Sequence, residues 1–135
     1  MPDLITKQDA YEHLRLDYDS DGSADDGWLS VFIPAVSEAV RLWLKESWRL
    51  YELTLDTDGN VILDSDGKPV PVLDSDGEPV VRWLVKAACL VELEGQYRYR
   101  AGEGNVAVPQ AAGHGYVLGK AATALLSAIR RPTVA

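Results

Sequence analysis

The residues best suited to chemistry in this chain are aspartates that precede glycine in three short, similar segments. LDTDGNVI at 55–62, LDSDGKPV at 63–70 and LDSDGEPV at 73–80 each place two aspartates around a Thr or Ser, directly before a glycine. Carboxylates at this density indicate either calcium loops or a series of tight turns. The two alternatives make different demands on the flanking residues, so the sequence can be tested for each.

A calcium loop of the EF-hand type needs Asp-x-Asp-x-Asp-Gly, followed by a glutamate six residues after the glycine. In none of the three segments do the first and last ligand positions carry a carboxylate. With Gly59, Gly67 or Gly77 as the loop glycine, these positions are Thr54 and Ser65, Ile62 and Leu73, or Val72 and Trp83. The repeats therefore do not match this site.

Asp-Gly is a strong hairpin signal, because both residues accept the positive φ of a type I′ turn. The flanking Leu and Val residues alternate as strands do. We therefore predict a β-hairpin or meander arm over residues 51–80, in which each proline removes a ladder donor and confines its strand to an edge. Its turns are expected at Asp58 and Gly59, Asp66 and Gly67, and Asp76 and Gly77.

A second acidic loop, residues 17–27, matches the calcium pattern more closely. Asp17, Asp19, Asp21 and Gly22 fit its first half, but position twelve is a tryptophan, Trp28. Two interpretations stay open: a partial cation site, or a solvated loop in which Asp25 or Asp26 caps the following helix.

Residues for catalysis are sparse. The chain has no nucleophile elbow, phosphate-binding loop or zinc-protease motif. His13 and His114 lie far apart, and no motif places a partner beside His114. Cys89 lies in an apolar run, as expected for a small buried side chain. We therefore expect no enzyme, metal or other cofactor, with a small enzyme centred on His114 as a remote alternative.

The hydrophobic pattern predicts about four helices, at residues 6–16, 25–48, 81–97 and 116–129. Thr6 and Asp9 form a variant capping box at the first start. The expected buried faces are Leu29, Phe32, Val36, Val40, Trp43 and Leu44 in the second helix, Leu84, Ala87, Ala88 and Val91 in the third, and Val117, Ala121, Ala124, Leu125 and Ala128 in the fourth. The expected fold is mainly α: one domain, 1–135, with a helical core at 5–50 and 81–131 and the arm inserted between helices two and three.

Composition limits the function classes. The 135 residues include 13 Lys and Arg and 21 Asp and Glu, for a net charge of −8. An acidic chain is not suited to holding nucleic acid through its phosphates. No apolar stretch reaches the ~18 residues that a membrane span needs. The start lacks a signal-peptide pattern, so we expect synthesis in a cytoplasm.

Taken in order, four segments resemble the head–tail connector, or adaptor, proteins of long-tailed bacteriophages. They are ITKQDAYEHLRLDYD, LSVFIPAVSEAVRLWL, VKAACLVELEGQYRYR and LLSAIRRP. The matching positions are Thr6, Ala10, His13, Leu14, Arg15, Asp17, Tyr97, Arg98, Leu125, Leu126 and Arg130. The resemblance implies a structural virion protein at the head–tail junction, made in the host cytoplasm. It also implies a homo-oligomeric ring of about a dozen copies, through which genomic DNA passes without specific binding. The arm lies outside the resemblance.

The family also implies partners. Its members dock on the portal protein through their C-terminal segment, here Arg130, Arg131, Pro132, Thr133, Val134 and Ala135. We expect the arm to contact a neighbouring subunit or the tail-side partner, a connector or tail terminator protein. The alternative is a calcium-dependent binding module that uses the aspartate-rich loops.

Overall fold

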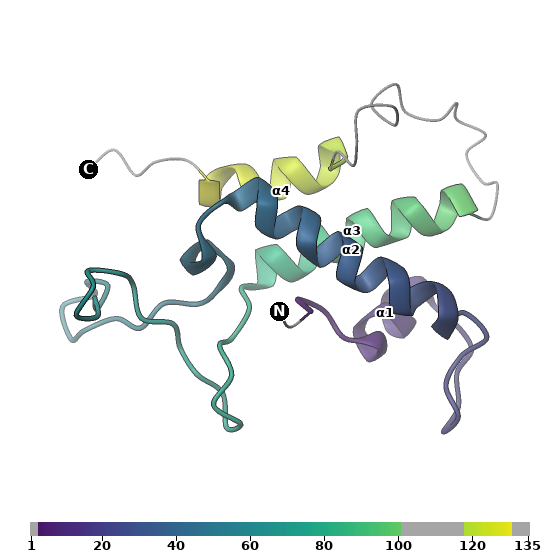
Figure 1. Cartoon of the computed structure of the whole chain (residues 1–135), viewed down its shortest axis with the longest axis horizontal. Coiled ribbons are helices and arrows are strands. Elements are labelled where there is room, and N and C mark those ends of the chain that lie inside the picture. Colours follow the sequence, from purple (N-terminus) through teal and green to yellow (C-terminus); the bar gives the residue numbers. More distant parts are fainter. Residues whose placement is uncertain (1–2, 101–117, 131–135) are drawn as a thin grey trace.

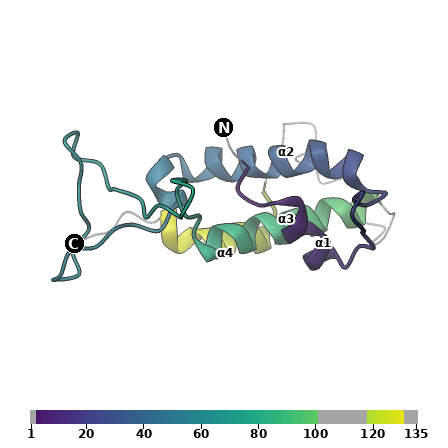
Figure 2. The same cartoon turned by 90° about the horizontal axis from the view of Figure 1, so that it is seen from below.

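The computed structural model describes residues 3–100 and 118–130, which are mainly helical (Figure 1). The helices in these ranges are α1 (Lys7–Leu14), α2 (Asp26–Leu44), the short 3-10 helix η1 (Ser47–Leu50), α3 (Trp83–Arg100) and α4 (Lys120–Arg130). Helix α2 forms one layer, and α1, α3 and α4 lie across it in a second layer (Figure 2). The expected four-helix body is therefore confirmed. In the described ranges, no helix is both long and apolar enough to cross a membrane.

Helix α1 begins as its sequence predicts. The Thr6 side chain accepts a hydrogen bond from the Asp9 backbone N–H (3.1 Å), and the Asp9 carboxylate accepts one from the Thr6 N–H (2.9 Å). This reciprocal pair satisfies two N–H groups that the helix cannot satisfy itself. The helix ends at Leu14, slightly earlier than expected, because Arg15 adopts the left-handed conformation with φ 56°.

The core lies where α2 packs against α3 and α4. Helix α2 buries a side chain at every third or fourth position, as an amphipathic helix should. These residues are Leu29, Ile33, Val36, Ser37, Val40 and Leu44. The two other helices contribute Val85, Ala88, Cys89 and Leu93 from α3, and Ala122 and Leu126 from α4. Cys89 is thus a small core side chain, as predicted.

The expected buried face of α3 is right at Ala88 but otherwise wrong by about one residue, and the face of α4 is displaced in the same way. Leu84 is 43% exposed, and its neighbour Val85 is fully buried. In α4 the buried residues are Ala122 and Leu126, whereas Ala121, Ala124 and Ala128 face solvent. Small and apolar residues occur on all sides of both helices, so the pattern does not define which side meets α2.

Polar contacts that the sequence did not reveal fix the packing of the helices. Glu92 of α3 is only 7% exposed, and its Oε2 accepts a hydrogen bond from the Gly119 N–H (2.9 Å) at the start of α4. A carboxylate at this position complements the helix dipole. The buried hydroxyl of Ser37 accepts a hydrogen bond from the Leu4 N–H (3.0 Å), which ties the N-terminal segment to α2.

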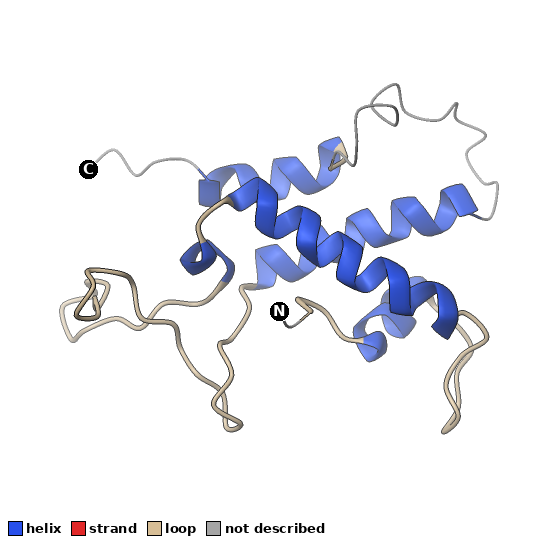
Figure 3. Ribbon diagram, in the orientation of Figure 1, coloured by secondary structure: helices blue, strands red, loops and turns tan. Residues whose placement is uncertain are grey.

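The segment between η1 and α3 contains no strand. Among residues 3–100 and 118–130, the only β features are isolated bridges, and Figure 3 draws residues 51–82 entirely as loop. The predicted β-meander is therefore not supported. The reason lies in the hydrogen bonding of this segment, which we call the arm (residues 51–82).

Candidate functional site: the acidic arm

Each aspartate-glycine repeat folds into the same turn. The Asp56 Oδ1 accepts hydrogen bonds from the backbone N–H groups of Asp58 and Asn60, both at 2.9 Å. The Gly59 N–H donates to the Asp56 carbonyl (3.1 Å), and the Asp56 N–H donates to the Asn60 carbonyl (2.8 Å). The same four bonds recur around Asp64 and Asp74. The first aspartate of each repeat is therefore a turn-stabilising residue.

The turns are not of the predicted type I′. Positive φ occurs at Gly59 (84°), Gly67 (78°) and Gly77 (81°), but not at the aspartates before them. A type I′ turn requires positive φ at both central residues. The bonds instead match a three-residue hairpin loop with glycine in the left-handed position of a bulge. The sequence suits both turns, and the first aspartate favours this one because its carboxylate holds two N–H groups.

The three hairpins meet in two closed triangles of backbone hydrogen bonds. In the first, Thr54 donates to Val70 (2.9 Å), Val70 to Ile62 (3.0 Å) and Ile62 back to Thr54 (3.0 Å). In the second, Glu52 donates to Val80 (2.9 Å), Val80 to Val72 (2.9 Å) and Val72 back to Glu52 (2.8 Å). The two triangles are joined by the bridge between Leu53 and Pro71. The arm is thus a pair of three-way junctions.

These junctions explain why no strand forms. Leu55 bridges Val61, but the N–H of the preceding residue, Thr54, donates to Val70 on a third segment. An antiparallel ladder would continue along the same partner. Every pairing therefore ends after a single bridge.

The prolines fit this arrangement. Pro69, Pro71 and Pro79 all lie at bridge positions, and the flanking residues carry the hydrogen bonds. Proline has no N–H to donate, so it is tolerated only where none is needed. The sequence predicted these prolines in edge strands, which is wrong, because they lie on isolated bridges beside the junctions.

The arm has no interior of its own. None of residues 51–82 is buried, and the leucines at the same place in each repeat, Leu55, Leu63 and Leu73, are 55%, 56% and 57% exposed. The arm extends away from the helices at the end opposite α1 (Figure 1). At its base, the Arg82 Nε donates to the Tyr51 carbonyl (2.9 Å) and the Arg82 N–H to the Leu50 carbonyl (2.9 Å), which holds the two ends of the arm together.

Charge is concentrated in the arm. The arm, residues 51–82, contains eight Asp and Glu and two basic residues, Lys68 and Arg82, a net −6 of the −8 for the whole chain. The other 103 residues contain 13 acidic and 11 basic side chains, a net −2, and are nearly neutral. The arm is therefore an acidic projection from a nearly neutral body.

The loop before α2, residues 17–27, is held in place by polar contacts. Asp19 and Gly22 exchange both backbone hydrogen bonds, at 3.1 and 3.0 Å. The Tyr11 hydroxyl donates a short hydrogen bond to the Asp26 Oδ1. This bond lowers the pKa of Asp26 and raises the pKa of Tyr11, since it favours the carboxylate and the neutral phenol.

The solvated-loop interpretation is right in part, because residues 17–21 are exposed, but the predicted side-chain cap does not form. Asp25 occupies the N-cap position of α2 without a side-chain cap bond, and its Oδ2 instead accepts from the Tyr97 hydroxyl (3.4 Å). Asp26 holds Tyr11 and does not cap the helix by its side chain. In the part of the chain that the structure describes, no group of three or more His, Cys, Asp or Glu side chains could hold a metal ion. The calcium alternative gains no support from this geometry.

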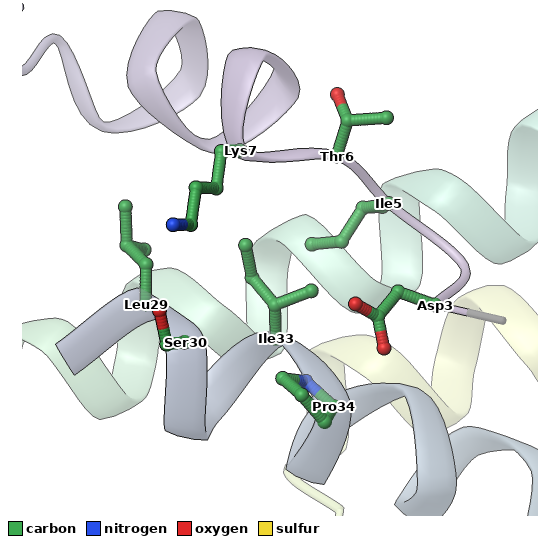
Figure 4. Close-up of a pocket in the computed structure, with 8 residues that line it drawn as sticks. All are labelled: Asp3, Ile5, Thr6, Lys7, Leu29, Ser30, Ile33 and Pro34. Atoms are coloured by element: carbon green, nitrogen blue, oxygen red, sulfur yellow. The ribbon is translucent and has the colours of Figure 1, made fainter. Parts of the chain in front are cut away.

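One hollow lies between the N-terminal segment and α2, with a volume of about 380 Å³. Figure 4 shows Ile5 and Ile33 between Lys7 on one side and Asp3 on the other. The Ser30 hydroxyl, also in the lining, donates to the Asp26 carbonyl (2.8 Å). The Thr6 hydroxyl is likewise engaged, by the Asp9 backbone N–H, so the hydrogen bonds of both hydroxyls in the lining go to the backbone and not to Asp3 or Lys7.

The remaining predicted site residues fall into two groups. Arg131, Pro132, Thr133, Val134, Ala135 and His114 lie outside the described residues. Arg130 ends α4, where its guanidinium lies over the Trp43 ring, 4.6 Å from the centroid. His13 lies beside Glu94 of α3, with its Nε2 3.9 Å from the Glu94 Oε2.

Comparison with known proteins yields no match among family models, curated proteins or solved structures.

Proposed function

We propose that this chain is a structural subunit of a bacteriophage head–tail connector, which assembles into a ring, docks on the portal protein and links the capsid to the tail. The sequence motifs suggest the family. The structural observation that supports it is a set of large apolar side chains left exposed on the helical body.

Val31 and Leu42 on α2 are 62% and 70% exposed. They are eleven residues apart, close to three helical turns, and therefore share one face of α2. Trp83, at the start of α3, is 77% exposed. Single exposed apolar residues are ordinary. Two on one face of α2, with the exposed Glu38 between them, suit a surface that a second protein covers by both apolar and polar contacts. A neighbouring copy in a ring would provide that cover.

The portal contact remains part of the proposal. Because Arg130 stacks on Trp43, its side chain holds the end of α4, and residues 131–135 would supply the anchor beyond it. Since the body is nearly neutral, repulsion of DNA phosphates would depend on whether the arm faces the channel.

The test is the assembly state of the purified protein, alone and with purified portal. Sedimentation velocity and negative-stain microscopy should show rings in at least one of these conditions. Val31→Asp with Leu42→Asp should abolish them without unfolding the protein, whereas Asp17→Lys with Asp21→Lys, two substitutions at exposed sites of the loop before α2, should not. A chain that stays monomeric in both conditions, with portal that binds none of it, would refute the proposal.

A further inference from the structure

The arm combines exposed leucines with free carboxylates in a regular arrangement. Leu55, Leu63 and Leu73 hold the same position in three hairpins and are each more than half exposed. Val61 and Ile62 are exposed as well, at 41% and 39%. Since the arm buries no side chain of its own, these residues do not stabilise it from within.

The aspartates of each repeat divide into two roles. The carboxylates of the first aspartates accept backbone hydrogen bonds within the turns; these residues are Asp56, Asp64 and Asp74. The second aspartates, Asp58, Asp66 and Asp76, are exposed at the tips, and within the described residues their carboxylates make no hydrogen bond or ion pair. The turns do not use these three charges, so they are free to meet a partner.

From this arrangement we propose that the arm is a docking element for a different protein, one with a basic surface that contains an apolar groove. The leucines would enter the groove, and the tip carboxylates would pair with lysines or arginines at its rim. Docking would also make the arm more rigid, because its conformation depends on solvent-exposed hydrogen bonds.

Charge favours a basic protein as the partner of the arm over nucleic acid, a second arm or the body of a sibling chain. Nucleic acid and a second arm are both negative and would be repelled. The body of a sibling chain, with 13 acidic and 11 basic side chains outside residues 51–82, offers no excess of positive charge. The inference goes beyond the proposed function, because docking through the arm does not require a ring.

The experiment uses the full chain and a defined probe, an amphipathic peptide of alternating leucine and lysine. Leucine–glutamate and serine–lysine peptides of the same length are controls, together with duplex DNA and the protein itself. Binding is followed by the backbone amide shifts of the protein. We expect the leucine–lysine peptide to shift amides of residues 51–82, and the other probes to leave them unchanged.

Three sets of variants distinguish binding by the arm from attraction to the overall negative charge of the protein. Asp58→Asn, Asp66→Asn and Asp76→Asn together should weaken binding about tenfold, the effect of three modest exposed ion pairs. Asp17→Asn, Asp21→Asn and Glu46→Gln together remove the same charge elsewhere and should change affinity less than twofold. Leu55→Ser, Leu63→Ser and Leu73→Ser should abolish binding while the Thr54 and Val72 amides stay protected from exchange.

Equal binding of the leucine–glutamate peptide would overturn the inference, as would unchanged affinity in the tip variant, arm-dependent binding to DNA, or arm-dependent self-association. Ring formation is measured separately with the helix variants above, so failure of one idea is distinguishable from failure of the other.

Discussion

Proline substitutions at two adjacent residues test the three-way junctions directly. In the first hairpin, Val61 holds the bridge position that Pro69 and Pro79 hold in the other two. Its N–H donates no backbone hydrogen bond within the described residues, whereas the next N–H, of Ile62, closes the first triangle by donating to Thr54. Val61→Pro should therefore be tolerated, and Ile62→Pro should open that triangle.

The magnitudes follow from the bonds. Proline at a compatible position stabilises by about 0.4–1 kcal/mol through the lower entropy of the opened chain. This corresponds to about two- to fivefold more protection of the hairpin amides from hydrogen exchange. Loss of the Ile62 bond should cost about 0.5–1.5 kcal/mol, which is about two- to twelvefold less protection.

The assay is amide exchange followed by NMR, which reports local opening that a global melt would miss. Ile62→Pro should reduce protection at Thr54 and Val70, with a smaller effect on Val72 and Val80 in the second triangle. Exchange in the core of α2 is the internal control and should not change. If both substitutions disrupt the arm equally, or neither affects it, the junction geometry is wrong.

Three further outcomes are expected. Leu126→Ala should lower the free energy of unfolding in urea by about 2–5 kcal/mol, because the side chain is fully buried, whereas Leu42→Ala at a 70% exposed site should stay within about 0.5 kcal/mol. Since the Tyr11 hydrogen bond lowers the pKa of Asp26 and raises that of Tyr11, its stabilisation should be lost as pH falls through the lowered value or rises through the raised one; thermal melts of Tyr11→Phe should show a weaker dependence at both extremes. Burial raises the pKa of Cys89 to about 12, so a thiol reagent at neutral pH should label it only when the protein unfolds, and rapid labelling in the native state would contradict its core position.

Local signals in the sequence were sufficient where a few neighbouring residues decide the structure. The cap at Thr6 depends on Asp9 three residues later, and both bonds formed as predicted. The apolar spacing of α2 is regular enough to place most of its buried face. In α3 the alanines and valines surround the helix, so only packing against α2 decides that Val85 is buried and Leu84 is not.

The arm was predicted only in part, because its junctions join residues that lie far apart in the chain. Its location and the positions of its glycines follow from short patterns. The triangles depend on Val70 meeting Ile62 and Thr54 at once, and strand patterns consider segments two at a time. The leucines that alternate as in a strand therefore lie on isolated bridges, and the candidate docking surface emerges only when three hairpins are assembled together.

The two triangles also determine how this region can change in length. Each hairpin leaves a triangle and returns to it eight residues later, at Thr54 and Ile62, Ile62 and Val70, or Val72 and Val80. Arg82 meanwhile keeps the two ends of the arm at a fixed separation beside Leu50. Duplication or loss of one such octapeptide in the gene would add or remove a whole hairpin. The helices on either side of the arm would keep their positions.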